Sequence, residues 1–295
     1  MFTVIGIVVV FGAILAGYLM EHGQLLVLFQ PAEFIIIVGA SLGTILIANP
    51  LPTAIRLLKD SLAVFKPDAR SKAFYLENLK MLNDLFGYAR KNGLTKLESD
   101  VDEPAKSPIF SKYRNFLSNG HAVHFICDTL RMYITAGVDP FDLDQMMELD
   151  MEVHHHEAQR PVSALTSTAD ALPGLGIVAA VLGIVITMGA LGGPPEEIGR
   201  KVAAALVGTF LGILLCYGLF GPIAARMTSI NEADAQYYHV VRVGILAFVR
   251  GSTPILAVEF ARRAIPSSVR PSFSEMEATC RRGGAAANAE QAAAA

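Results

Sequence analysis

The chain has 295 residues, of which only 17% are charged and 53% are hydrophobic, and its mean hydropathy is +0.44. A soluble domain usually has about 25% charged residues. The net charge of −3 excludes a typical nucleic-acid-binding protein, which needs a surplus of Lys and Arg, and the apolar content excludes an intrinsically disordered chain. Cys127, Cys216 and Cys280 are too far apart for a disulfide framework or a zinc motif.

The apolar excess is concentrated in four segments that contain no Asp, Glu, Lys, Arg or His. They are residues 2–20, 34–51, 172–191 and 202–222. About 20 apolar residues in a helix cross a hydrocarbon core of roughly 30 Å. The first segment lacks the positive start of a secretory signal and is interpreted as a retained helix. The sequence therefore predicts an all-α, polytopic membrane protein with four transmembrane helices.

The basic residues predict the orientation, because 22 of the 24 Lys and Arg lie in the two long segments between and after the apolar pairs. By the positive-inside rule these segments and both termini are cytoplasmic. Four regions follow: an N-terminal transmembrane hairpin (1–51), a helical cytoplasmic domain (52–171), a C-terminal transmembrane hairpin (172–222), and a cytoplasmic helix with an Ala-rich disordered tail (223–295).

Within the cytoplasmic domain, helical spacing of apolar residues predicts helices over 71–92 and 121–136, which Gly93 and Gly137 end. Asp139 and Pro140 then form an N-cap and first helical position, and a long helix continues toward the third apolar segment. Pro161 is a candidate kink in that helix.

Two patterns of small residues four apart lie in the apolar segments, at Gly39–Gly43 and Gly208–Gly212. Such patterns permit close approach of helices in lipid. Packing within one subunit and an interface between copies both remain open.

The apolar segments lack any ionisable group, and a hydroxyl cannot store a proton at neutral pH. We therefore expect a partner protein to supply the carboxylate if the chain conducts ions. Threonine hydroxyls in the third and fourth segments can line a wet path, or can instead bond to a carbonyl of their own helix.

The three consecutive histidines 154–156 do not predict a metal site, because neighbours on a helix point about 100° apart. A solvated helix face explains them better. No nucleophile and base are spaced as in an enzyme, so we expect no enzyme activity, no metal and no cofactor.

Three longer motifs are the most specific features of the chain. They are LDMEVHHHE at 149–157, ALPGLGIVAAVLG at 171–183 and VGTFLGILLCYG at 207–218, the last followed by Gly221-Pro222. On these motifs, and on the layout of two spans, a cytoplasmic domain, two spans and a tail, residues 1–260 resemble the MotA family of flagellar motor stator subunits.

The resemblance implies roles for six residues: Arg90 and Glu98 as rotor-facing charges, Pro173 and Pro222 in conformational coupling, and Thr209 with Thr187 along the ion path. Each proline also lies near the end of a predicted span, where it could simply start or end a helix.

The resemblance also implies a homo-oligomer, with five copies around a MotB dimer whose aspartate binds the transported ion, in the bacterial inner membrane. The ion is expected to be a proton, and the rotor protein FliG is expected to receive the torque. A sodium-driven stator of the same family remains an alternative. A TolQ- or ExbB-like energiser of outer-membrane processes is another, although the extra N-terminal hairpin argues against it.

Overall fold

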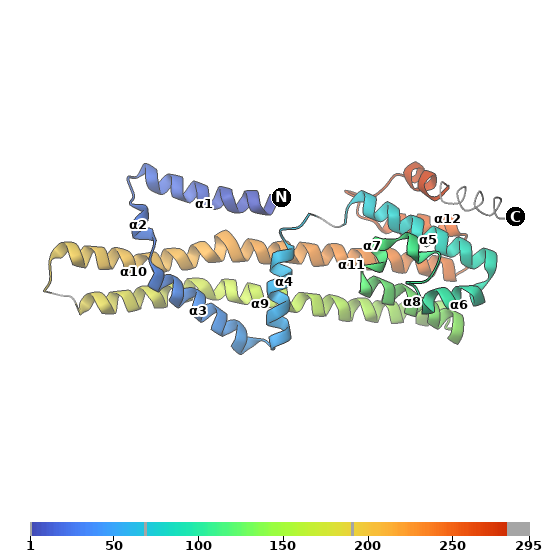
Figure 1. Cartoon of the computed structure of the whole chain (residues 1–295), viewed down its shortest axis with the longest axis horizontal. Helices are drawn as coiled ribbons and strands as arrows, with labels where there is room; N and C mark the ends of the chain where they lie inside the picture. The colour runs from blue at the N-terminus through green and yellow to red at the C-terminus, as the bar shows by residue number, and fades with distance from the viewer. Residues whose placement is uncertain (1, 68–69, 190–191, 282–295) are drawn as a thin grey trace. The chain divides into compact units, whose positions relative to one another are not determined.

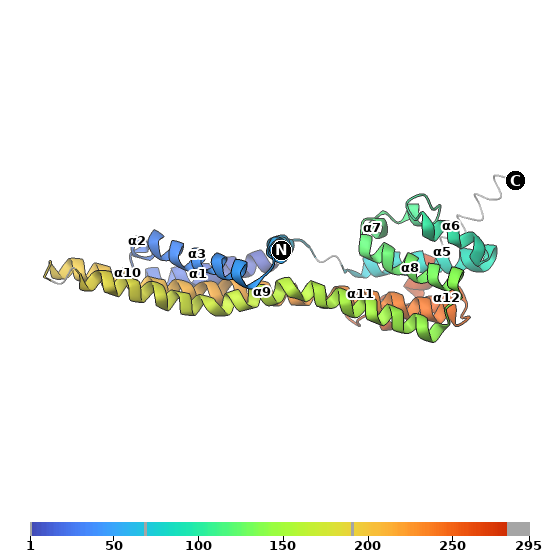
Figure 2. The ribbon, with the colours of Figure 1, turned by 90° about the horizontal axis from the view of Figure 1, so that it is seen from below.

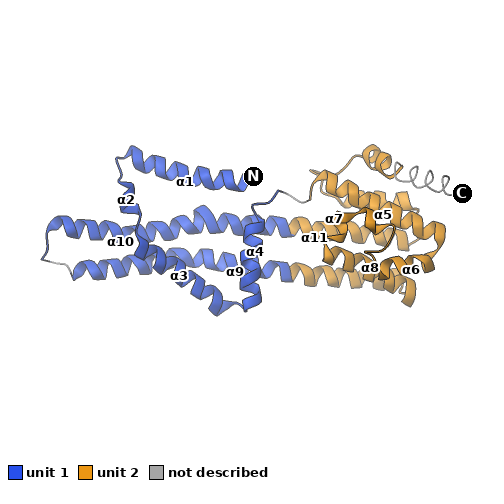
Figure 3. Cartoon of the chain, in the orientation of Figure 1, with its two compact units in different colours: residues 1–67, 157–231 blue, residues 68–156, 232–295 orange. Residues whose placement is uncertain are grey.

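The structure is a computed structural model that describes residues 2–67, 70–189 and 192–281, and these residues form helices and connecting turns without a β-strand (Figure 1). The chain divides into two compact units, each built from two separate segments (Figure 3). Unit 1 comprises Met1–Pro67 and Glu157–Asn231, and unit 2 comprises Asp68–His156 and Glu232–Ala295. The predicted borders at 51, 171 and 222 separate membrane-spanning regions from cytoplasmic ones. The division into compact units does not test these borders, so they stay predictions.

Unit 1 contains the apolar helices. Its elements are α1 (Phe2–Met20), α2 (Leu25–Leu28), α3 (Pro31–Ala48), α4 (Leu51–Ala63), the later part of α9 (Pro140–Met188), α10 (Pro195–Leu215), the π-helix η2 (Cys216–Phe220) and the first part of α11 (Gly221–Val249). Four helical stretches are long and apolar enough to span a membrane: Phe2–Met20, Leu25–Ala48, and parts of Pro140–Met188 and Pro195–Val249. The prediction of an all-α fold with four apolar spans is confirmed.

The second apolar helix begins and ends three residues earlier than the predicted segment 34–51, since α3 runs from Pro31 to Ala48. Pro50 explains the early end, because the residue before a proline is disfavoured in helical conformation. Asn49 is accordingly extended (φ −131°, ψ 145°). Pro31 explains the early start, because proline is well suited to the first helical position.

Helices α9 and α10 lie side by side in unit 1 and pack through glycines (Figures 1 and 2). A β-carbon on Gly176 would lie 2.8 Å from the carbonyl oxygen of Gly208, and one on Gly212 would lie 2.5 Å from the carbonyl oxygen of Leu172. The Gly208–Gly212 pattern therefore packs within the chain. Gly39 has open space at its β-position, so the other pattern is not used for packing within the chain.

Neither functional proline candidate ends a helix. Pro173 lies inside α9, which continues from Pro140 to Met188 through both Pro161 and Pro173, so the alternative that Pro173 starts a helix is wrong. Pro222 is the second residue of α11 and directly follows the π-helix η2. The wider π turn lets the Gly221 N–H bond to the carbonyl oxygen of Cys216, which accommodates a proline that has no N–H to donate.

Unit 2 is a helical domain around one hydrophobic core. Its elements are α5 (Lys72–Asn92), α6 (Leu94–Asp102), the 3₁₀ turn η1 (Phe110–Lys112), α7 (Arg114–Leu117), α8 (Gly120–Ala136), the first part of α9, the later part of α11 and α12 (Pro254–Ala264). The predicted helix ends are confirmed: Gly93 (φ 87°) follows α5 and Gly137 (φ 62°) follows α8, both in the conformation that glycine tolerates best.

The start of α9 is also confirmed. Oδ1 of Asp139 accepts hydrogen bonds from the backbone N–H groups of Phe141 (2.8 Å) and Asp142 (3.2 Å). These bonds stabilise the charged carboxylate and hold the pKa of Asp139 below its usual value. The predicted disordered tail, residues 283–295, lies outside the described residues.

Candidate functional site

Glu33, in the first turn of α3, is the most unusual polar residue of unit 1. Its side chain is only 7% exposed, and its Oε2 is buried without a hydrogen-bond partner. A β-carbon on Gly208 would lie 2.5 Å from this oxygen, and one on Gly183 would lie 3.5 Å from Oε1. The carboxyl group therefore lies against the glycine contact between α9 and α10.

The prediction that the apolar helices bring no ionisable group is therefore wrong. In the sequence, Glu33 directly precedes the uncharged segment 34–51, so the pattern predicts that it belongs to a loop. In the structure it is the third residue of a helix, and it reaches Gly208, which is six residues past Val202, the start of the fourth apolar segment. At 1.5 Å per residue, that is about 9 Å into the segment.

The two predicted path threonines differ in their hydrogen bonds. The Thr187 hydroxyl is buried and donates to the carbonyl oxygen of Gly183 at 2.8 Å, which is the back-bond that many helical threonines make. Thr209 is partly exposed, and its hydroxyl has no hydrogen-bond partner among the described residues. Only Thr209 keeps its donor available for an ion, a water or a partner group.

The structure does not bring Thr187 and Thr209 together. Gly183 of α9 packs on Ala205 of α10, and the helices are antiparallel. Thr187 lies four residues from this contact in one direction, and Thr209 lies four residues from it in the other. The two threonines are therefore about 12 Å apart along the helix pair, with Glu33 between their levels.

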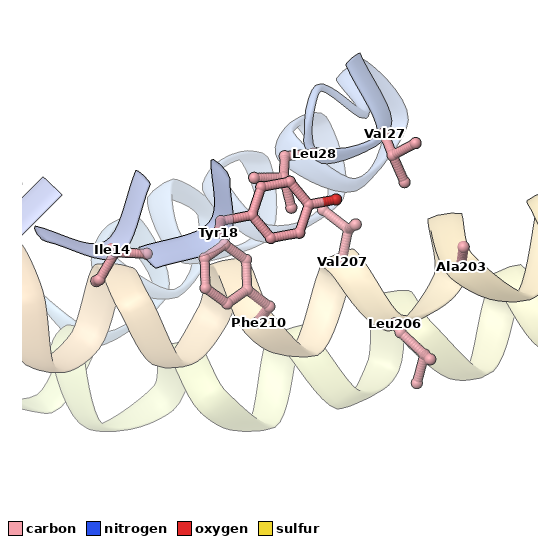
Figure 4. Close-up of a pocket in the computed structure, with 8 residues that line it drawn as sticks. All are labelled: Ile14, Tyr18, Val27, Leu28, Ala203, Leu206, Val207 and Phe210. Carbon is pink, nitrogen blue, oxygen red and sulfur yellow. The ribbon is translucent and has the colours of Figure 1, made fainter. Parts of the chain in front are cut away.

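An apolar pocket of about 330 Å³ lies elsewhere in unit 1, between α1, α2 and α10 (Figure 4). It is lined by Ile14, Tyr18, Val27, Leu28, Ala203, Leu206, Val207 and Phe210. The Tyr18 hydroxyl, the one polar side-chain group among them, donates to the carbonyl oxygen of Gln24 at 3.4 Å. The lining has no charge to hold an ion, so this pocket suits hydrocarbon rather than the transported species.

Arg90 and Glu98 lie in unit 2 on either side of Gly93. Arg90 is in the last turn of α5 and exposed, and Glu98 is in α6 and partly exposed. Neither makes an ion pair or hydrogen bond with its side chain in the part of the chain that the structure describes. Both charges are therefore available to a partner protein.

His154 and His156 lie in different surroundings. The ring of His154 stacks on His121 with centroids 3.6 Å apart and meets the edge of Tyr238 at 5.2 Å. The prediction that the histidines lie on a solvated helix face is confirmed for the exposed His156. It is wrong for His154, which packs against other rings in unit 2. Across the described ranges, three potential ligands from His, Cys, Asp and Glu gather nowhere.

Comparisons with known proteins agree with this architecture. Residues 4–93 match the family described as Motility protein A N-terminal, and residues 114–239 match the MotA/TolQ/ExbB proton channel family. The chain is 38% identical to Motility protein A of Escherichia coli over 94% of both chains. The chain belongs to the Motility protein A family. It is also 35% identical to Chemotaxis protein LafT of Vibrio parahaemolyticus, over 92% of this chain and 96% of the relative.

Two solved structures share the fold. The MotAB structure of C. jejuni matches with a TM-score of 0.75 and 19% identity, over 92% of this chain and 98% of that chain. The flagellar MotAB stator complex of Bacillus subtilis matches with a TM-score of 0.73 and 22% identity, over 90% and 96%. The chain is thus a multi-pass membrane protein of the flagellar stator family, which is a family of ion-channel subunits and not a known class of enzymes.

Proposed function

We propose that this chain forms the inner-membrane part of a proton-driven flagellar stator together with a MotB dimer, and that it turns the rotor protein FliG. The observation that carries the proposal is the glycine-packed pair α9 and α10, which presents an unbonded Thr209 hydroxyl in a member of the Motility protein A family. Both termini and unit 2 lie in the cytoplasm, as the distribution of Lys and Arg indicates.

Large apolar side chains on the membrane helices support an oligomer with a second protein. Val181, Val185 and Leu206 on α9 and α10 are between 52% and 61% exposed in the single chain. If ions cross the membrane beside Thr209, lipid cannot cover all the exposed faces of α9 and α10. We propose five copies around two MotB helices, with the remaining outer faces in contact with lipid.

In this arrangement a proton binds an aspartate of MotB and moves inward past Thr187 and Thr209. Neutralising a buried charge changes which packing of the helices is favoured. Each proton supplies about 2.3 kcal/mol per 100 mV of membrane potential, enough to shift a packing equilibrium of a few kcal/mol.

Pro173 and Pro222 are the proposed points where this shift bends the helices. Each removes a backbone hydrogen bond inside a long continuous helix, and Pro222 adjoins a π turn whose hydrogen bonding is already altered. Unit 2 then moves Arg90 and Glu98 past complementary charges on FliG, through contacts that form and break quickly because they are exposed.

The match of residues 4–93 to the motility-specific N-terminal family favours a stator over a TolQ- or ExbB-like energiser. The test is to express the chain with and without its cognate MotB in cells that lack stators, and to record rotation of tethered cells. Rotation is expected only with both proteins. Normal rotation without MotB, or none with it despite normal membrane levels, would refute the proposal, and the dependence of speed on external sodium and pH identifies the ion.

A further inference from the structure

Glu33 has three properties that an ordinary residue in the first turn of a helix does not need. A glutamate there is favoured by the helix dipole even when it faces water. Glu33 instead is more than nine-tenths buried, lies between two apolar helices, and has an oxygen without a hydrogen-bond partner. Burying a carboxyl group in this way costs free energy, so a purely structural explanation accounts poorly for it.

The carboxyl group of Glu33 packs against two glycines. Gly183 and Gly208 provide the space, and the side chain of Ala179 would lie 3.1 Å from a β-carbon on Gly208. On α10, Lys201 pairs with Glu197 at 3.3 Å, and Lys201 lies seven residues, about two turns, before Gly208. Thr187 is the polar side chain of α9 closest in sequence to Gly183.

Along the helix pair, Glu33 lies between the positions of the two threonines. They lie about 12 Å apart along α9 and α10, too far for direct transfer of a proton between hydroxyls. Glu33 contacts the helix pair between them, at Gly183 and Gly208. A carboxyl group can take up and release a proton, which a threonine hydroxyl cannot do at neutral pH.

We propose that Glu33 is a second proton-binding carboxylate of the ion path, contributed by this chain, between the levels of Thr187 and Thr209. This inference rests on the proposed function, since it requires that the complex conducts protons. In each cycle Glu33 gains one proton from the outer side and gives one proton to the inner side, so its charge alternates between −1 and 0. The two glycines keep the site open while the carboxyl group changes state.

The decisive variant is Glu33→Gln, which keeps the shape of a protonated glutamate and cannot release a proton. The measurement is proton flux through the complex with MotB in liposomes under an imposed potential. We expect flux to fall by roughly 100-fold, the lower end of what a positioned proton-transfer group contributes, with MotB still copurifying. Glu33→Asp is expected to keep part of the flux.

Ser41→Ala is the matched control. Ser41 lies on the same buried face of α3 as Glu33, and its hydroxyl already donates to the carbonyl oxygen of Val38 at 2.8 Å, so its loss should leave flux unchanged. Flux at the wild-type rate in Glu33→Gln would overturn the inference, because a structural carboxyl group is replaced well by the amide. If the wild-type complex itself does not conduct, the proposed function fails instead.

If the Glu33→Gln variant does not assemble with MotB, the Gly208→Ala variant tests the inference instead. Its β-carbon would lie 2.5 Å from Oε2, too close for a real contact, so it would displace the carboxyl group without removing it. A large loss of flux in an assembled Gly208→Ala complex supports the inference, and wild-type flux contradicts it.

Discussion

Thr187 donates its hydroxyl hydrogen to the carbonyl oxygen of Gly183 at 2.8 Å, one turn back along α9. Thr209 on α10 makes no such bond among the described residues. The two threonines that the family resemblance assigns to one path are therefore not equivalent, because one hydroxyl already has a hydrogen-bond partner and the other has none in the described part of the chain.

This difference predicts unequal effects of removing each hydroxyl. Thr209→Val should lower proton flux and torque roughly fivefold, as expected for loss of about 1 kcal/mol from one hydrogen bond. Thr187→Val should have a smaller effect, because the valine removes a bond to its own helix. Flux in liposomes and torque of tethered cells measure both variants at equal membrane levels. Equal losses, or an unchanged Thr209→Val, would contradict the assignment.

The glycine contact between α9 and α10 predicts a stability effect. Gly212→Ala places a methyl group 2.5 Å from the carbonyl oxygen of Leu172, and overpacking of this kind costs about 1–3 kcal/mol. We expect a lower thermal unfolding midpoint of the purified complex. Gly39→Ala is the control, since its β-position is open and alanine favours helix. A stable Gly212→Ala would show that the helices do not pack as closely as described.

The exposed charges of Arg90 and Glu98 lead to the prediction that exchanging them reduces torque but leaves assembly of the complex intact. Exchanging the charges with Arg90→Glu and Glu98→Arg together should abolish or strongly reduce swimming. Since neither side chain has an ion-pair partner in the described structure, stability should change by no more than about 0.5 kcal/mol. Copurification with MotB and unfolding of the complex are measured alongside motility. Failure of assembly would make the two charges structural.

The pH dependence of stability follows from Glu259 in α12. Arg262 and Arg263 donate to its carboxylate at 2.6–2.8 Å, and they lower its pKa from 4.5 to about 2. Because the pKa is depressed in the folded state, the stabilisation is complete above pH 4.5 and is lost as pH falls toward about 2.

We therefore expect Glu259→Gln to lower the unfolding midpoint at neutral pH and to flatten its decline in acid. Glu103→Gln serves as the control, because the pair of Glu103 and Lys106 is exposed and contributes little. An acid decline in Glu259→Gln as steep as in the wild type would contradict the role of this cluster.

Much of the fold could be predicted from local patterns. The uncharged runs predict the four apolar helices, and Gly93, Gly137 and Asp139 predict the helix ends of unit 2, because each acts on its own stretch of backbone. The positions of unit borders could not be predicted in this way. They depend on which distant segments pack together, such as Glu157–Asn231 with Met1–Pro67.

The candidate site also contains one residue that the sequence predicts and one that it does not. A motif identifies Thr209, whereas no local pattern identifies Glu33. Its neighbours in sequence look like the end of a loop, and its neighbours in space, Gly183 and Gly208, lie about 150 residues or more away. Pro31 was the available signal: a proline two residues before Glu33 predicts a helix start that includes the glutamate.

The central claim is that this chain and MotB conduct protons only as a joint path. The most direct measurement is proton flux into liposomes that contain the chain alone, MotB alone, or the purified complex, under the same imposed potential and without sodium. We expect flux only with the complex. Comparable flux with the chain alone, or none with an assembled complex, would contradict it.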